Sequence, residues 1–350
     1  MVGPVQVGHP SAWRGTDLDS LSSVAFRLEP RHLAPLEDAY ERCVAAGVTT
    51  DTLTRADFPL PGIEDELAEL LHEVQYGRGF VVLEHLPVGE WPIEKVALTY
   101  LGLMSHFGAP EMQSVLGDRV GRVENVSGKD TRERGYRNSA ELNLHSDFSH
   151  GFLAMLSVRT AATGGESVYA SAVTIHNIIS EERPDLLEPL YAGFRFHRLD
   201  SALPDEAPVT EERIPTFSVV DGLLTCRYAR AIIESAMDEV GEVHDPRTRE
   251  ALDYFDAVAS RPGVAFEAVV QPGQILLAND LVTLHSRRGF DDAPGEGNGR
   301  LFLRAWLRPD EPRPRLPVTD AVPSFERREG ASTYYRGRSA KIGGTGVEAS

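Results

Sequence analysis

The chain has 350 residues, and 41% of them are hydrophobic, which is ordinary for a globular protein with a sizeable core. Its formal net charge is −18 and its pI is about 5.1. Because so acidic a surface repels phosphate groups, the charge argues against nucleic acids and anionic membranes as partners. The two cysteines, Cys43 and Cys226, form no CxxC pair. The sequence therefore offers no disulfide framework and no zinc ribbon, and it fits a reducing cytoplasm.

Signals for export or membrane insertion are missing from the sequence. Residues 1–17 contain neither the basic region nor the apolar stretch of a secretion signal. No apolar run approaches the roughly 20 residues that a membrane span needs. We therefore expect a cytoplasmic protein that acts on a small molecule, and the sequence leaves a homo-oligomer open.

The first hundred residues predict a leader, three helices and a strand. Residues 1–20 are rich in Gly, Pro and Ser, which indicates a flexible leader. Apolar residues recur at helical spacing over 37–46, 63–75 and 94–107, which predicts three amphipathic helices. Between the second and third of these, 78–88 is a β-branched run bounded by Gly and Pro, which is typical of a buried strand.

The remainder of the chain is dominated by short strands, with helices between them. Strands are expected at 119–126, 141–149, 152–159, 167–173, 193–198, 214–219, 222–228, 264–270, 274–278, 281–286 and 300–307. Helices are expected at 173–191, with a break at Pro184, and at 229–238 and 246–260.

These elements do not alternate regularly between strand and helix, so a doubly wound parallel sheet is the weaker choice. Clustered short strands with helices before and between them favour an α+β fold with a distorted double-stranded β-helix, or jelly-roll, core. We expect one domain over 21–324, with a helical insert at about 174–262. The composition after Pro309 turns to Pro, Arg, Gly and Ser, which predicts a mobile tail over 325–350.

A His-x-Asp motif, His145-Ser146-Asp147, is the first candidate metal-binding element. Residues i and i+2 of a strand project from the same face, so both side chains can reach one ion. The motif is short enough to arise by chance. Of the eleven histidines, however, His145 alone has an acid two residues later, and it ends a strand-like run, ELNLHSD.

A third ligand has to come from another segment, and His285 is the best candidate. It lies in the strand-like stretch ILLANDLVTLHSRRGF, which follows a Pro-Gly turn. Two histidines and one carboxylate leave coordination positions open for a cosubstrate and O₂, as in non-haem iron(II) oxygenases. Zinc hydrolases use a similar number of ligands, but the helical HExxH spacing is absent here. Among the other histidines, we interpret His150 as a candidate substrate-cavity residue because it lies near the motif.

Two arginines follow the second histidine on a predicted strand. Arg300 and Arg304 are four residues apart and project from one face together with Phe302. A dicarboxylate that chelates iron through one end needs a fixed cation at the other end. Arginine supplies that cation through two parallel charge-assisted hydrogen bonds. The alternative is that both arginines flank the strand and pair with surface acids.

At these residues the sequence resembles the taurine dioxygenase/clavaminate synthase-like family of iron(II)/2-oxoglutarate oxygenases. The resemblance covers roughly residues 60–310. Its strongest pieces occur in the family's order and read LNLHSDFSHGF, ATGGESVYASAVTIHNII, PGQILLANDLVTLHSRRGF and GRLFLRAWL.

The resemblance implies roles for individual residues. His145, Asp147 and His285 match the iron ligands. Arg300 matches the arginine that binds the far carboxylate of 2-oxoglutarate, and Arg304 matches a position that faces the substrate or supports the cosubstrate. The remaining implied positions are the hydroxyl of Ser167, which would bind the same carboxylate, and Asn279, which would shape the strand behind the ligands. The loop between His285 and Arg300 is a little longer than in the taurine enzyme. This leaves open which of the two arginines, Arg300 or Arg304, binds which carboxylate.

The implied cofactors are Fe²⁺, 2-oxoglutarate and O₂, with CO₂ and succinate as co-products. Because Asp147 is present, hydroxylation is favoured over the halogenation that relatives without this carboxylate carry out. Desaturation and cyclisation are alternatives at the same site. The predicted substrate is a small amino-acid-like or carboxylate metabolite, with Arg227 and Arg230 as further candidate contacts. A metal-dependent hydrolase or isomerase on a cupin-like barrel, and a non-catalytic sensor of 2-oxoglutarate, are the rival functions.

Overall fold

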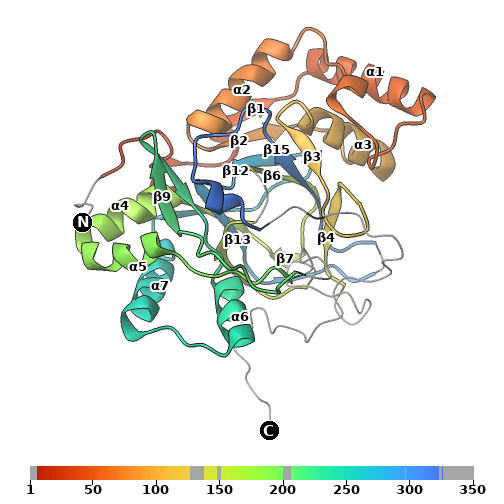
Figure 1. Ribbon diagram of the computed structural model, residues 1–350. Helices are drawn as coiled ribbons and strands as arrows, with labels where there is room; N and C mark the ends of the chain where they lie inside the picture. Colours follow the sequence, from red (N-terminus) through yellow and green to blue (C-terminus); the bar gives the residue numbers. More distant parts are fainter. Residues whose placement is uncertain are drawn as a thin grey trace.

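The computed structural model describes residues 6–126, 138–147, 151–199, 206–295, 297–322 and 325. Two β-sheets form its centre, and helices cover the outer face of each (Figure 1). Among the described residues, no helix combines the length and the apolar composition that crossing a membrane requires.

The larger sheet contains seven strands, and its neighbouring strands are antiparallel except for the pair β1–β2. Their order across the sheet is β1-β2-β12-β6-β15-β3, and β4 also pairs with β15. The strands are β1 (Ala25–Arg27), β2 (Phe80–Glu84), β3 (Ala109–Glu111), β4 (Gly121–Glu124), β6 (Phe152–Arg159), β12 (Ile275–Asn279) and β15 (Leu301–Arg308).

The smaller sheet has four antiparallel strands in the order β11-β8-β13-β5. These strands are β5 (Leu142–His145), β8 (Ser167–Ser171), β11 (Ala265–Ala268) and β13 (Thr283–Arg287). Two short hairpins accompany the sheets. They consist of β9 (Phe217–Val220) with β10 (Leu223–Cys226), and β7 (Thr163–Gly164) with β14 (Phe290–Asp291).

Helices cover the two outer faces of this pair of sheets (Figure 1). The larger sheet packs against α1 (Pro30–Ala45), α2 (Glu64–Tyr76) and α3 (Ile93–Met104). The smaller sheet packs against α4 (Ala172–Glu182), α5 (Leu187–Ala192), α6 (Arg230–Val240) and α7 (Pro246–Ala259). Short 3-10 helices lie at η1 (Gly15–Asp17), η2 (Ser22–Val24), η3 (Arg55–Asp57), η5 (Pro184–Leu186) and η7 (Pro317–Asp320).

Alternation along the strands decides which side chains lie between the sheets. In β2, Val81 and Leu83 pack on the helices, whereas Phe80 and Val82 join a separate core cluster. That cluster also contains Tyr169 of β8, so it fills the space between the two sheets. Since successive residues of a strand face opposite sides, the side chains beside Phe302 in β15 at positions 300, 304 and 306 face the same interior.

Residues 6–20, within the segment predicted to be a flexible leader, pack on the protein. Trp13 is 5% exposed, and its indole Nε1 donates to the Arg78 carbonyl at 3.1 Å. The carbonyl of Trp13 accepts from the Thr174 hydroxyl at 2.6 Å, and the amide of Gly15 donates to the Val264 carbonyl at 3.0 Å. The Gly, Pro and Ser content of this segment carries no information about these contacts.

Differences elsewhere are local. The first helix begins at Pro30 instead of residue 37, because Pro fits the first helical turn. The strands expected at 193–198 and 214–219 shrink to isolated bridges and β9, while the break at Pro184 is confirmed by η5 between α4 and α5. The predicted tail lies outside the described residues except for Phe325, whose ring stacks on Trp306.

Candidate active site

The smaller sheet brings the two predicted metal-binding histidines together. His145 at the end of β5 is the register partner of His285 in β13, and their ring centroids are 4.4 Å apart. His285 also faces Tyr169 of β8 across the neighbouring strand pair. Register in the sheet therefore joins two histidines that are 140 positions apart in the sequence.

Asp147 completes the group, although it lies beyond the strand that was expected to carry it. Strand β5 ends at His145, because the next residue, Ser146, bonds to Tyr228 instead of to a sheet neighbour. The Asp147 Oδ1 atom nevertheless lies 3.6 Å from His145 Nε2 and 3.8 Å from His285 Nε2. The potential ligand atoms of these three residues all lie within 4.8 Å of one another, and the side chains are half-buried.

The second oxygen of Asp147 is held by β15. Trp306 Nε1 donates to Asp147 Oδ2 at 2.8 Å, and Arg304 Nη1 lies 3.5 Å from the same atom. Burial alone would raise the pKa of Asp147, but the His145 contact and the Arg304 charge bring it far below its usual value. The carboxylate is therefore ionised at neutral pH, with Oδ1 directed to the histidines and Oδ2 to Trp306.

The histidines have partners on their outer nitrogens. His145 Nδ1 lies 2.7 Å from the Asn143 carbonyl, and His285 Nδ1 lies 3.4 Å from Asp280 Oδ1. Burial lowers the pKa of His145, but Asp147 and the Asn143 carbonyl together raise it above the usual value. Partners of this kind fix the orientation of a metal-binding imidazole.

Asn279, which was expected behind the ligands, shapes the turn between β12 and β13. Its Oδ1 accepts from the Leu281 amide at 3.1 Å, and its Nδ2 donates to the Val74 carbonyl at 3.3 Å. The neighbouring residue, Asp280, makes the contact with His285.

Arg300 is buried in an aromatic environment between the sheets. It is 3% exposed, and its guanidinium lies 3.9 Å from the Phe302 ring centroid and 5.4 Å from that of Phe290. Burial and the nearby Arg287 charge lower its pKa to about 10, so it is still a cation at neutral pH. Within the described residues, its Nη1 has no hydrogen-bond partner. An unpaired buried donor on a cation is costly, and an anion placed there would remove the cost.

Hydroxyl groups and a glycine turn lie beside this cation. Ser167 is buried at the start of β8 and bonds to Tyr169, whose pKa burial raises to about 12. Gly164 and Gly165 precede it with φ of +69° and +76°, and a Cβ at Gly165 would lie 3.3 Å from Arg300 Nε. The Gly-Gly turn therefore supplies a left-handed backbone and leaves room for the guanidinium.

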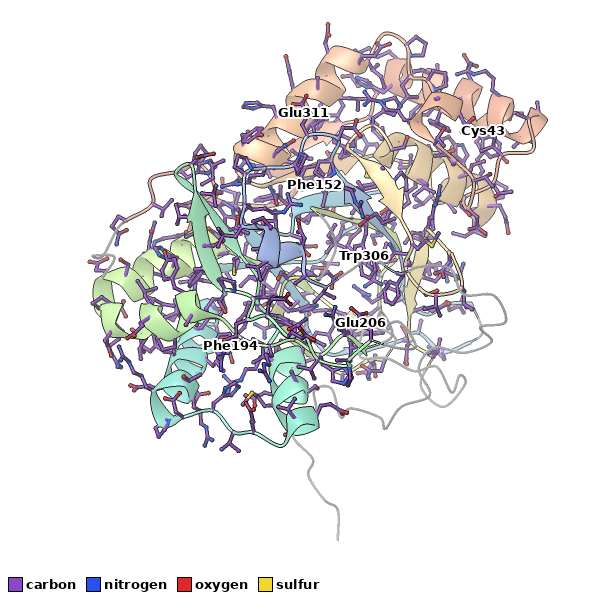
Figure 2. All side chains as sticks on the ribbon, in the orientation of Figure 1. Cys43, Phe152, Phe194, Glu206, Trp306 and Glu311 are labelled. Atoms are coloured by element: carbon purple, nitrogen blue, oxygen red, sulfur yellow. The ribbon has the colours of Figure 1, made fainter. Side chains whose placement is uncertain are left out.

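Arg304 lies on the same face of β15 but in a different environment. Its Nε donates to Gln113 Oε1 at 2.8 Å, and its guanidinium lies 4.3 Å from the Trp306 ring centroid. Trp306 is labelled near the centre of the molecule in Figure 2. Arg304 thus adjoins the candidate metal ligand Asp147, whereas Arg300 lies near Phe290, Phe302 and Tyr169.

The remaining candidate substrate-binding residues lie in different environments. Arg227 is 2% exposed, and its Nη1 donates to the Asp147 main-chain carbonyl at 2.9 Å. Arg230 forms ion pairs with Glu234, Asp253 and Asp256 on α6 and α7, so its guanidinium is committed to those helices. His150 lies outside the described residues.

Four residues that adjoin the site were missed by the sequence reasoning. Trp306 and Tyr169 could have been found by continuing the two-residue period from Arg304 and from Ser167. Asp280 was signalled by an acid within an otherwise apolar run, ILLANDLV. Gln113, which follows β3, carries no local signal of this kind.

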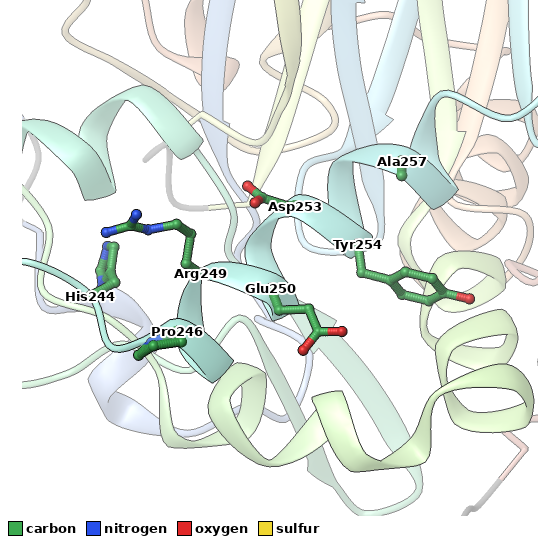
Figure 3. Close-up of a pocket in the computed structure, with 7 residues that line it drawn as sticks. All are labelled: His244, Pro246, Arg249, Glu250, Asp253, Tyr254 and Ala257. Atoms are coloured by element: carbon green, nitrogen blue, oxygen red, sulfur yellow. The ribbon is translucent and has the colours of Figure 1, made fainter.

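A groove outside this site lies along α7 (Figure 3). It contains none of the predicted site residues. Its lining residues are His244, Pro246, Arg249, Glu250, Asp253, Tyr254 and Ala257.

Comparison with known families and proteins supports the resemblance in the motifs. The profile of the family described as "Taurine catabolism dioxygenase TauD, TfdA family" matches residues 45–306. The chain belongs to this family. It is 30% identical over 312 residues to FR-33289 synthase of Streptomyces rubellomurinus, a match that covers 87% of this chain and 90% of that protein. It is 25% identical over 320 residues to the taurine hydroxylase-like protein SAT17 of Stachybotrys chartarum, covering 87% and 80% respectively.

Solved structures show the same fold at lower sequence identity. An asparagine oxygenase in complex with Fe(II), hydroxyasparagine and succinate superposes with a TM-score of 0.63 at 17% identity, covering 81% of this chain and 94% of that one. The non-haem iron oxygenase OrfP with Fe and α-ketoglutaric acid gives 0.58 at 16% identity, covering 81% and 93%.

As a member of the TauD/TfdA family, the protein is an iron(II)- and 2-oxoglutarate-dependent dioxygenase. The predicted family, enzyme class and cofactors are confirmed. This result favours the oxygenase over the metal-dependent hydrolase or isomerase that the residues alone had left open.

Proposed function

We propose that His145, Asp147 and His285 hold the Fe²⁺ of this dioxygenase. The observation that carries the proposal is the convergence of two imidazoles and a carboxylate, with their ligand atoms all within 4.8 Å of one another. This donor set suits non-haem iron(II) and leaves positions for a cosubstrate and O₂. We also propose that the two facing sheets form the distorted double-stranded β-helix expected from the sequence, with the iron between them.

The distal carboxylate of 2-oxoglutarate would bind Arg300, supported by the Ser167 hydroxyl. Arg300 is a buried cation with a free Nη1 donor, and an anionic ligand would satisfy both its charge and that donor. Arg304 fits this role less well because it adjoins Asp147 and Gln113. We assign Arg304 to the substrate or to the metal-proximal end of the cosubstrate.

The reaction would hydroxylate an unactivated C–H bond. One oxygen atom of O₂ enters the substrate C–H bond and the other enters 2-oxoglutarate, which leaves as succinate and CO₂. The bound iron supplies the O₂ chemistry, and the protein supplies orientation and exclusion of water. Trp306 holds one Asp147 oxygen so that the other faces the histidines. Desaturation or cyclisation would instead remove two hydrogens from the substrate, and the oxygen atom that does not enter succinate would leave as water.

The substrate would be a small amino-acid-like or carboxylate metabolite, as the sequence suggested. The similar solved structures contain hydroxylated asparagine and hydroxylated arginine, which supports an amino-acid-like ligand. The buried guanidinium of Arg304 beside Asp147 offers such a ligand a cation close to the proposed iron. Arg230 offers none, because three carboxylates already surround it.

Anaerobic titration tests the proposed ligands. Adding iron(II) and 2-oxoglutarate should produce a weak visible charge-transfer band, and His145→Ala should abolish it. His72→Ala, on α2 beyond the larger sheet, is the matched control and should retain the band. A full band in His145→Ala would remove His145 from the ligand set.

Turnover with pooled metabolites under ¹⁸O₂ tests the reaction. Mass spectrometry should show a product that gains one labelled oxygen atom, with stoichiometric succinate. A product that loses two hydrogens and gains no label would identify desaturation or cyclisation instead.

A further inference from the structure

Arg227 is a buried cation that contacts the main chain of Asp147, one of the proposed metal ligands. It follows β10 and is 2% exposed. Its Nη1 donates to the Asp147 carbonyl at 2.9 Å, and its Nε donates to the Thr319 carbonyl at 3.3 Å. Its Nη2 lies 3.7 Å from Asp320 Oδ1. The three nitrogens of one guanidinium therefore face the metal-binding segment and η7, which is dark blue in Figure 1.

The main chain beside Arg227 joins the same segments. The Ser146 amide donates to the Tyr228 carbonyl at 2.7 Å, and the Tyr228 amide donates to the Ser146 hydroxyl at 3.0 Å. These bonds place Arg227 next to Asp147 independently of its side chain. Substituting the side chain therefore removes the guanidinium contacts while these two bonds hold the segments together.

Asp280 links Arg227 to the second ligand-bearing strand. Its carboxylate lies 3.4 Å from His285 Nδ1, and it interacts electrostatically with Arg227. Both side chains are buried, so each charge offsets part of the other's desolvation. Arg227 thus acts on Asp147 through a hydrogen bond and on His285 through Asp280.

We propose that Arg227 is a positioning residue of the metal centre. Its guanidinium fixes the main chain of Asp147 and connects Asp147 to the C-terminal segment 319–320. Through Asp280, it also connects His285 to that segment. This inference rests on the proposed ligand set. It replaces the substrate-binding role that the sequence suggested for Arg227, since its nitrogens are directed to protein acceptors. A lysine could not reproduce the contacts, because its single nitrogen cannot reach acceptors in three directions.

Binding of Mn²⁺ alone, followed anaerobically by electron paramagnetic resonance, tests the proposal without turnover. Arg227→Met should weaken Mn²⁺ binding by about 10- to 100-fold, the range for partners of metal ligands. It should also alter the line shape at saturating Mn²⁺, because the carboxylate ligand is less well fixed.

Arg313→Met is the matched control. Arg313 is 3% exposed and donates at 3.2 Å to the carbonyls of Gln75 and Leu224, so it also anchors the C-terminal segment from a buried position. It contacts none of the proposed ligands. Both Arg313→Met and Arg227→Met should lower the melting temperature of the metal-free protein. The Mn²⁺ affinity of Arg313→Met should stay within about twofold of the wild type, a much smaller loss than is expected for Arg227→Met.

Arg227→Lys preserves the charge and serves if Arg227→Met does not fold. It should bind Mn²⁺ about tenfold more weakly than the wild type, because the fixed donor geometry is lost. Wild-type Mn²⁺ affinity in a folded Arg227→Met or Arg227→Lys protein would overturn the inference and leave the proposed ligands intact. Failure of the wild-type protein to bind Mn²⁺ would instead overturn the ligand set, and the inference with it.

Discussion

Arg300 and Arg304 show how one residue type in one strand acquires two environments. Both face the space between the sheets, and their side chains flank Phe302. The difference arises from other segments: Asp147 and Gln113 adjoin Arg304, while Phe290 and Arg287 adjoin Arg300. Among the described residues, the guanidinium of Arg300 forms no ion pair with a carboxylate, whereas that of Arg304 lies 3.5 Å from Asp147 Oδ2. Arg300 is therefore better suited to an exchangeable anionic ligand.

Substituting the two arginines separately tests this division. Arg300→Ala should weaken 2-oxoglutarate by about 1.5–3 kcal/mol for each charged hydrogen bond lost, which is roughly 10- to 150-fold. Arg304→Ala should have a smaller effect on 2-oxoglutarate and a larger one on substrate. Dissociation constants from the anaerobic charge-transfer band measure the first effect, and a larger loss in Arg304→Ala would reverse the assignment.

Among the elements, the helices that cover the smaller sheet are held to each other by surface charges as well as by their apolar faces. Helix α7 begins at Asp245-Pro246, where the Asp245 carboxylate accepts from the amides of Arg247 and Thr248. At its other end, Arg261 and Tyr254 bond the carboxylate of Glu182 at the end of α4. These contacts lower the pKa of Glu182 to about 2.

The Glu182 contact predicts a pH-dependent contribution to stability. Because the pKa is lower in the folded protein, the contribution is full above the usual value of 4.5 and disappears as pH falls toward 2. Glu182→Gln should lower the melting temperature slightly at pH 6, since exposed ion pairs contribute little. The difference from wild type should shrink between pH 4.5 and pH 3 in calorimetry. A constant difference over that range would show that charge is not its cause.

At the scale of the whole molecule, the proposed iron joins elements that are distant in sequence. The proposed ligands come from β5, the segment after it and β13. Arg300, the proposed partner of the cosubstrate, precedes β15 of the other sheet. A ligand that binds only the folded arrangement stabilises it by mass action, by about 2.7 kcal/mol at a hundredfold excess over its dissociation constant.

Mn²⁺ with 2-oxoglutarate should therefore raise the melting temperature of the wild-type protein by several degrees, and excess chelator should reverse the rise. His285→Ala should melt at the same temperature with and without these ligands. Scanning calorimetry at one fixed scan rate measures both. An equal rise in His285→Ala would place the bound metal elsewhere.

The sequence by itself determined the elements and the residues whose roles depend on local spacing. Period-two alternation grouped Arg300, Phe302 and Arg304 on one face. In the His-x-Asp motif, only one residue separates His145 from Asp147, so the two side chains lie close together even though β5 ends at His145. Helical periodicity located α2, α3, α6 and α7 to within a few residues. These inferences succeed because the backbone repeat fixes the direction of neighbouring side chains.

Only the tertiary structure decided which segments meet. Nothing near Arg227 in the sequence indicates that Asp147 and Thr319 are its partners, or that Gln113 would orient Arg304. The packing of residues 6–20 depends likewise on carbonyls and helices far along the chain. A buried polar group takes the partner that the fold brings within hydrogen-bonding distance, and that proximity is set by sheet register and layer packing, which local sequence does not encode.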